Sequence, residues 1–301
     1  MKKTLFLFFT VLFIFSIGGT ANAANPLKLN VNGAVQDELP SPLVRKNVSY
    51  VPIRTAQSLG YKVTWNSRSK TVLVVDPHTS DTLSLAVGSG AARINEKKLE
   101  LDTPPFVEKN TVYVPLRFMS GSFGTLVHWD SKNNGIVIIS PNPEIQKELN
   151  SGDLAKARLA VIGLPRVQFY YSTVHPEGPM TSFIYTENDY SKWYFLHSDS
   201  IYYYELKNGY MSLVWEGQMS AKTQENSSSP LAKFLGTGID TLWGEQPKLT
   251  SRLIYFEDRI FPYDEGEYGI IGADGSVEFS HKVVNPKQLS DIIVNFKEEN
   301  Q

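Results

Sequence analysis

Histidine is the side chain most able to hold a transition metal in this chain, which contains no cysteine. The five histidines lie far apart, and none follows another at the i+2 spacing of a strand or the i+4 spacing of a helix: His78, His128, His175, His197 and His281. The sequence therefore predicts no metal site, no copper and no cofactor. Without cysteine, disulfides and cysteine nucleophiles are excluded as well.

A second group of side chains with possible chemistry is an acidic run near the C-terminus, formed by Glu257, Asp258, Asp264, Glu265 and Glu267. Their oxygens could surround calcium, but the run lacks the alternating Asp-x-Asp-x-Asp-Gly spacing of a calcium loop. We interpret it as a solvated loop. A hydrolase in which two of these carboxylates face each other across a cleft is kept as an alternative.

Other catalytic motifs are incomplete. The residues Ser67-Arg68-Ser69-Lys70 have the Ser-x-x-Lys spacing of penicillin-recognising enzymes, but they fall in a predicted hairpin turn and lack the companion motifs. Nucleophile-elbow, zinc-protease and phosphate-loop motifs are absent from the sequence. We therefore expect that the protein is not an enzyme.

Aromatic side chains could bind sugar rings by stacking, and the chain has 15 tyrosines and 5 tryptophans. In the second half, Asn208-Gly209 predicts a two-residue hairpin turn, and counting outward pairs Tyr202 with Trp215 on an apolar face that we assign to the core. The aromatics predicted to point outward instead are Trp193, Tyr203 and Tyr210. They are the speculative ligand contacts of an alternative function, a cell-wall or polysaccharide-binding adhesin.

The first 23 residues are typical of a secretory signal peptide. Lys2 and Lys3 precede an apolar run from Leu5 to Ile17, and Ala21-Asn22-Ala23 offers a small-x-small cleavage site. We expect a mature chain from Ala24 that works outside the cytoplasm, secreted or associated with the cell wall. The alternative is an uncleaved segment, which would be the protein's contact with the membrane.

The charge balance limits the partners. The chain has 29 basic and 31 acidic residues, and without Lys2 and Lys3 its formal charge is about −4. This balance argues against nucleic acid, and the lack of a long basic block argues weakly against adhesion to anionic cell-wall polymers by charge. A cell-wall polymer or another surface protein remains as a possible partner, which the sequence does not identify.

The first half of the chain contains a repeat. Val51-Pro52-Ile53-Arg54 returns 63 residues later as Val114-Pro115-Leu116-Arg117, and Leu29-Asn30-Val31-Asn32 corresponds to Ala92-Arg93-Ile94-Asn95 at the same offset. At an offset of 64, Gly60 matches Gly124 and Trp65 matches Trp129. Each copy predicts strands around one short helix.

Eight residues mark the structural motif of the repeat: Pro52, Arg54, Gly60, Trp65, Pro115, Arg117, Gly124 and Trp129. We place the prolines at the first helical position and the glycines in the left-handed conformation that ends a helix. Both tryptophans are expected at equivalent, buried places, where truncation to alanine would cost about 3 to 5 kcal/mol. The arginines are expected to form structural ion pairs or to cover apolar surface with their stems.

These motifs resemble the copper amine oxidase N-terminal-like domain, or stalk domain, of exported bacterial proteins. The resemblance covers residues 27–140 and includes Tyr50-Val51-Pro52-Ile53-Arg54, Thr103-Pro104-Pro105 and Val127-x-Trp129-Asp130. The sequence departs from the family pattern at Glu96, where glycine is usual, and before Gly124, where the stretch is longer. The resemblance implies an antiparallel sheet around a helix, used as a noncatalytic stalk or adhesion module.

The family name does not imply amine oxidase activity here. Copper amine oxidase chemistry requires a tyrosine within an Asn-Tyr-acidic motif and three histidines on one copper. The sequence has no Asn-Tyr pair, and Asn188-Asp189-Tyr190 has the wrong order. We expect an exported, noncatalytic stalk or scaffold protein at the bacterial cell surface.

The second half predicts a different domain. Residues 141–152 are interpreted as a linker with some helical character, and Asp153 as the N-cap of a helix that Gly163 ends and that packs on the following sheet. Residues 153–301 then form an antiparallel β domain of unknown function. The fold class predicted is mainly β (α+β): an N-terminal antiparallel sheet with short helices from a duplicated unit, then this second β domain with one N-terminal helix.

Overall fold

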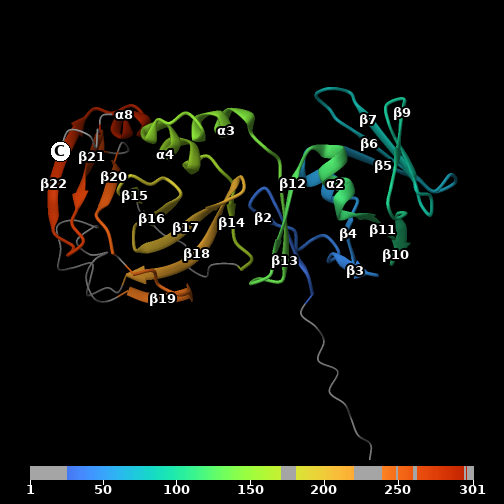
Figure 1. Cartoon of the computed structure of the whole chain (residues 1–301), viewed down its shortest axis with the longest axis horizontal. Helices are drawn as coiled ribbons and strands as arrows, with labels where there is room; N and C mark the ends of the chain where they lie inside the picture. Colours follow the sequence, from blue (N-terminus) through green and yellow to red (C-terminus); the bar gives the residue numbers. More distant parts are fainter. Residues whose placement is uncertain are drawn as a thin grey trace, which may run out of the picture.

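The structure is a computed structural model that describes residues 26–170, 181–219, 239–248, 250–259, 263–294 and 296. Two units lie side by side along the long axis of the molecule (Figure 1). The described residues are mainly β, as predicted, with short helices and sheets that are antiparallel apart from two parallel pairs. The predicted signal peptide lies outside the described residues.

The first unit consists of three sheets and two helices. Its strands are β1 (Lys28–Val31), β2 (Ala34–Val35), β3 (Leu43–Arg45), β4 (Val48–Pro52), β5 (Lys62–Asn66), β6 (Thr71–Val75), β7 (Thr82–Ala86), β8 (Ala91–Ile94), β9 (Lys97–Glu100), β10 (Phe106–Glu108), β11 (Thr111–Pro115), β12 (Leu126–Asp130) and β13 (Gly135–Ile139). Its helices are α1 (Thr55–Ser58) and α2 (Leu116–Phe123).

The two copies of the repeat pair with each other at the centre of this unit. Strands β4 and β11 are antiparallel, with Val51 opposite Val114 and Tyr50 opposite Pro115. Because Val114 is the repeat equivalent of Val51, the pairing places a pseudo-twofold axis between these two residues. The hairpins β3–β4 and β10–β11 thus form one four-stranded sheet, β10-β11-β4-β3.

The two outer sheets each combine strands from both copies. Sheet β12-β13-β1-β2 joins the last hairpin of the second copy to the first hairpin of the first copy, with β1 parallel to β13. Sheet β5-β6-β7-β8-β9 joins the complementary hairpins, but β7 is inserted between β6 and β8. The copies therefore interlock, and neither has a complete sheet by itself.

The helices of the two copies begin at other residues than predicted but end at the predicted glycines. Pro115 is the N-cap of α2, and Pro52 is the last residue of β4, three residues before α1, so neither is a first helical residue. The prolines end strands here because they lack the N–H that a continuing ladder needs. Gly60 and Gly124 are left-handed as predicted, with φ of 93° and 62°.

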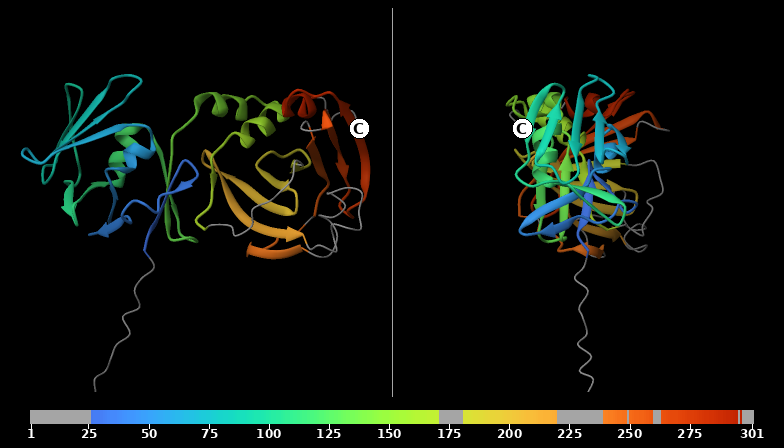
Figure 2. Two further views of the ribbon diagram at one scale, coloured as in Figure 1. Left: turned by 180° about the vertical axis from the view of Figure 1, so that it is seen from behind. Right: turned by 90° about the vertical axis from the view of Figure 1, so that its right-hand side faces the viewer.

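The second unit is one curved sheet covered by helices on one face (Figures 1 and 2). Its strands are β14 (Arg166–Val167), β15 (Thr181–Thr186), β16 (Lys192–His197), β17 (Ser200–Lys207), β18 (Tyr210–Met219), β19 (Ile239–Gly244), β20 (Leu253–Arg259), β21 (Glu265–Ile271) and β22 (Val277–Val284), and its helices α3 (Pro143–Leu149), α4 (Leu154–Ile162) and α8 (Leu289–Ile293). Asp153 caps α4 as predicted, accepting a 3.1 Å hydrogen bond from the Lys156 amide. Leu149 of α3 and Val161 of α4 lie in the core against the sheet.

A β-bulge changes the hairpin register that the sequence predicts. Lys207 faces Tyr210 and Tyr204 faces Leu213, as expected from the turn at Asn208-Gly209. Beyond that point Val214 is the extra residue, so Trp215 faces Tyr203 and not Tyr202. The predicted Tyr202–Trp215 pair is therefore wrong, since one inserted residue moves all later side chains to the other face.

A packed interface joins the two units. Asn30 of β1 is fully buried and donates a 3.0 Å hydrogen bond to the Gln168 carbonyl, while Lys28 Nζ donates to the Phe169 carbonyl at 2.7 Å. The apolar part of the interface consists of Val137, Ile139, Val167, Phe169 and Tyr210, all less than 9 % exposed. The two units therefore hold a fixed relative orientation.

Candidate functional site

The aromatic side chains predicted to point outward are buried. Trp193 is 0 %, Tyr203 8 % and Tyr210 6 % exposed, so the prediction that they face solvent is wrong. Trp193 packs in the core beneath the helices. Tyr203 packs against Tyr194 on the opposite face of the sheet, with tilted rings and a centroid distance of 4.6 Å. Tyr210 lies in the interface between the units. None of these three side chains exposes an aromatic face on which a sugar ring could stack.

Part of the acidic run is a hairpin and not a solvated loop. Glu257 and Asp258 lie in β20 and Glu265 and Glu267 in β21, with Glu257 directly opposite Glu267. Glu257 is 1 % exposed, and burial raises the pKa of its carboxyl group. This part of the interpretation was wrong because β20 is an inner strand, which the acidic composition did not indicate.

The carboxylates of this hairpin already have hydrogen-bond donors within the sheet. Arg259 Nε donates to Glu257, and the Tyr255 hydroxyl donates to Glu267 Oε1 at 2.6 Å. Burial also raises the pKa of the Tyr255 hydroxyl, which therefore stays protonated and can donate this hydrogen bond. This arrangement is a structural polar network of the sheet.

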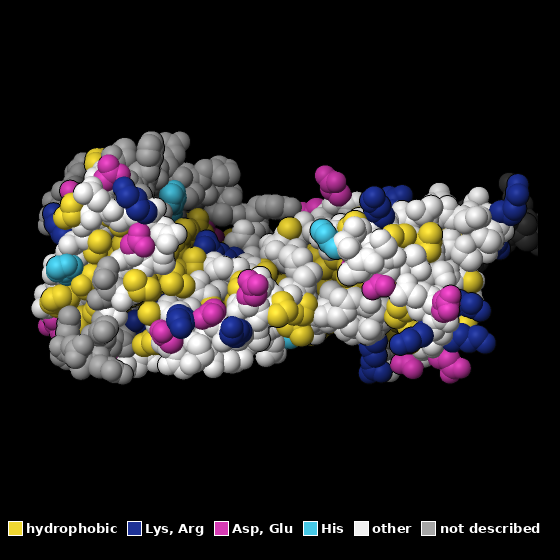
Figure 3. Space-filling model, turned by 90° about the horizontal axis from the view of Figure 1, so that it is seen from above, with side chains coloured by type: hydrophobic (Ala, Val, Ile, Leu, Met, Phe, Trp, Pro, Cys, Tyr) yellow, Lys and Arg dark blue, Asp and Glu magenta, His cyan; other side chains and the backbone are white. Residues whose placement is uncertain are grey.

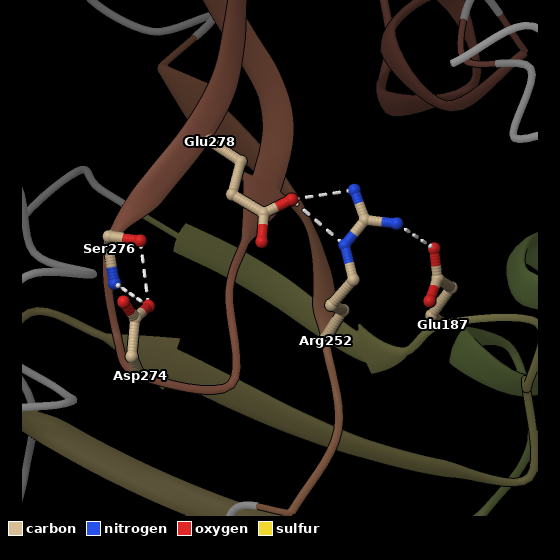
Figure 4. A network of polar contacts seen from close by, with 5 residues as sticks. All are labelled: Glu187, Arg252, Asp274, Ser276 and Glu278. Atoms are coloured by element: carbon tan, nitrogen blue, oxygen red, sulfur yellow. Dashed lines mark hydrogen bonds and ion pairs between the residues drawn. The ribbon is translucent and has the colours of Figure 1, made fainter.

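A second carboxylate pair is bridged by one arginine (Figure 4). Arg252 Nη1 lies 2.6 Å from Glu187 Oε1, and its Nε and Nη2 lie 2.9 and 2.6 Å from Glu278 Oε2. The hydrogen bond that Arg252 donates to Glu278 raises the pKa of the Arg252 guanidinium, which is charged throughout the physiological range. The network ties the end of β15 to the start of β20 and to β22.

Among the described residues, no three His, Asp or Glu side chains come together as metal ligands. His175 lies outside the described residues. No helix in the described ranges is both long enough and apolar enough to cross a membrane.

The tryptophans of the repeat occupy equivalent places, as predicted, but they are not buried. Each is the fourth residue of its strand, Trp65 opposite Val72 and Trp129 opposite Ile136. Trp65 is 43 % and Trp129 50 % exposed, so the prediction of two core tryptophans is wrong. Both lie on edge strands, where a side chain has a neighbouring strand on one side only.

The arginines of the repeat are also on the surface. Arg117 pairs with Asp102 at 3.9 Å, but both side chains are more than 80 % exposed, so the pair contributes little to stability. Arg54 is exposed, and no acidic residue in the described ranges forms an ion pair with it. Among the described residues an ion pair is thus present for Arg117 and not for Arg54, and its exposure gives it little structural weight.

Two grooves flank the pseudo-twofold axis. The α1 groove has a volume of about 790 Å³ and is lined by Ile53, Arg54, Gln57, Val63, Trp65, Val72, Val107, Asn110, Thr111 and Val112. The α2 groove, of about 580 Å³, is lined by Asn47, Val48, Ser49, Leu116, Arg117, Phe118, Ser120, Val127 and the segment Leu99–Thr103, together with Pro115, Gly121 and Ser122.

The lining residues show that these grooves are repeat equivalents. Asn47 and Asn110, 63 residues apart, both occupy left-handed hairpin-turn positions with φ of 61°. Each groove thus combines the helix end of one copy with the central hairpin of the other copy. The sequence contained the repeat, but the grooves arise from the pairing of β4 with β11, which the sequence did not predict.

Comparison with known proteins identifies the first unit. Residues 30–138 match the family model of the copper amine oxidase N-terminal domain. The first unit is therefore a copper amine oxidase N-terminal-like domain, as the motifs predicted. A search of the curated proteins gave no match.

Proposed function

We propose that this protein is an exported, noncatalytic scaffold of the bacterial cell surface, in which the first unit acts as a stalk. The observation that carries the proposal is the packed interface between the units, where Asn30 and Lys28 bond to backbone carbonyls at 168 and 169. A stalk must hold what it carries in a fixed orientation, and this interface supplies that rigidity. The apolar N-terminal segment supports export.

Export is tested by expressing the full chain in a Gram-positive host and fractionating the cells. We expect the protein in the wall fraction or the medium, with Ala24 as its first residue. Leu12→Arg, which interrupts the apolar segment, should keep the protein in the cytoplasm. Recovery of the unaltered chain in the cytoplasm with Met1 retained would contradict export, and recovery at the membrane with Met1 retained would favour the uncleaved anchor.

The noncatalytic role is tested with the same purified protein. Incubated with copper and a primary amine, it should release no more hydrogen peroxide than copper in buffer. A turnover signal above that background would overturn the proposal that the family domain acts here as a stalk. Heat-denatured protein serves as the matched control for peroxide from bound metal.

A further inference from the structure

The two copies of the repeat keep the same residues at surface positions that packing does not require. Arg54 and Arg117, and likewise Trp65 and Trp129, are identical and exposed. Trp65 lines the α1 groove and is 43 % exposed, so part of its indole surface is available to a ligand there.

The α1 groove presents three kinds of group together. The half-exposed indole of Trp65 offers an apolar face suited to a sugar ring. Gln57 and Asn110, both exposed, offer amide donors and acceptors for hydroxyl groups. Arg54 offers a planar cation that matches a carboxylate.

We propose that the α1 groove binds a polysaccharide strand that carries carboxylate groups. Trp65 stacks on a sugar ring, Arg54 pairs with a carboxylate and the two amides bind hydroxyls. The positive charge of Arg54 is the only formal charge in the lining of this groove, so the groove complements an acidic strand.

The α2 groove differs in charge, although it has the same architecture. Glu100 and Asp102 line it, and Asp102 lies within 3.9 Å of Arg117. Its formal charge is therefore −1, from one arginine and two carboxylates. Trp129 is not among its lining residues, so this groove lacks both the free cation and the stacking face.

A peptide fits the α1 groove less well than a sugar chain. A peptide that adds to a sheet pairs its backbone with an edge strand, here β5 or β10, and this pairing would not use the exposed side chains of Arg54 and Gln57. Stacking on Trp65 and side-chain hydrogen bonds require no strand edge. The geometry therefore favours a glycan.

The proposal is tested by calorimetric titration of the purified full chain with tetragalacturonate, which carries a carboxylate on each ring. We expect a Kd below about 1 mM that weakens as salt is added. Trp65→Ala and Arg54→Gln should each weaken binding about tenfold. The matched variants Trp129→Ala and Arg117→Gln should change it less than about twofold.

Several results would overturn the proposal. They are an absence of binding, equal effects of the matched variants, or equal affinity for the uncharged chitotetraose or for hexaglutamate, which has carboxylates without sugar rings. Thermal melting of each variant shows whether it is folded, and all four positions are exposed. Purified protein suffices for this test, so a negative result leaves the proposed export untouched.

Discussion

The two outer sheets of the first unit have the same origin but different surroundings. In sheet β12-β13-β1-β2, one row of cross-strand neighbours faces the second unit, and we call it the dry row: His128, Val137, Asn30 and Val35. The equivalent row of the other outer sheet is the wet row: Thr64, Leu73, Ser84, Arg93 and Lys98. Val137 is 0 % exposed and its repeat equivalent Leu73 is 42 % exposed. One building block has thus become a dry interface at one end of the domain and a wet surface at the other.

The chemistry of each row follows its surroundings. The dry row contains one amide side chain, Asn30, whose Nδ2 and Oδ1 atoms are both hydrogen-bonded, at 3.0 and 2.9 Å. The wet row replaces Asn30 with Arg93 and Val35 with Lys98. Figure 3 shows basic and acidic side chains interspersed over the face it presents, with no continuous block of one sign. A surface of this kind resists nonspecific association.

The largest expected effect comes from a charge in the dry row. Val137→Asp would place an unpaired carboxylate among Phe169, Tyr210 and their neighbours, and we expect a loss of more than about 4 kcal/mol in the free energy of unfolding. Leu73→Asp, at the equivalent wet position, should change it by less than about 0.5 kcal/mol. Urea denaturation of both variants measures the difference, and similar losses would refute the contrast between the two sheets.

A smaller effect is expected from the buried amide. Asn30→Ala leaves the Gln168 carbonyl and the Gly33 amide without their partner, which should cost about 1 to 3 kcal/mol. Arg93→Ala is the matched variant and should cost less than about 0.5 kcal/mol. If both variants unfold at the same urea concentration, Asn30 does not stabilise the interface.

Truncation of either repeat tryptophan should have the same small effect on stability. Trp65 and Trp129 lie on the strand faces opposite Thr64 and His128, so docking of the second unit leaves Trp129 half exposed. Each alanine variant should cost about 1 kcal/mol, well below the about 3 to 5 kcal/mol of a buried tryptophan. A large loss for Trp129→Ala alone would mean that docking does bury this face.

The pH dependence of stability tests a buried carboxylate in the sheet of the second unit. Burial raises the pKa of the Glu257 carboxyl group in the folded state above its value in the unfolded chain. Stability from this group is therefore present at low pH and is lost as the pH rises through the raised pKa. Glu257→Gln should flatten the curve of unfolding free energy against pH, measured in urea from pH 4 to 8. An unchanged slope would show that Glu257 titrates normally.

The repeat can be read directly from the sequence, and the Asn208-Gly209 turn and the Asp153 cap could be predicted because they depend on neighbouring residues. The exposure of Trp65 could not, because it follows from the position of β5 at a sheet edge. The bulge at Val214 likewise leaves no local signal, and it reversed the predicted side of Trp215. The sequence contains the apolar and charged residues of the two rows, but they are far apart along the chain. Only the strand register shows that the residues of each row are neighbours on one face of a sheet.

The pairing of Val51 with Val114 has a consequence for a shortened chain. A polypeptide that contained a single copy would leave β4 paired with β3 on one side only, and its two outer hairpins would belong to different, incomplete sheets. Two such molecules could pair their β4 strands with each other across a true twofold axis and complete each other's sheets. The duplicated domain therefore has the arrangement of a homodimer whose two subunits are joined in one chain. Because the two copies are joined, their association does not depend on the concentration of the protein.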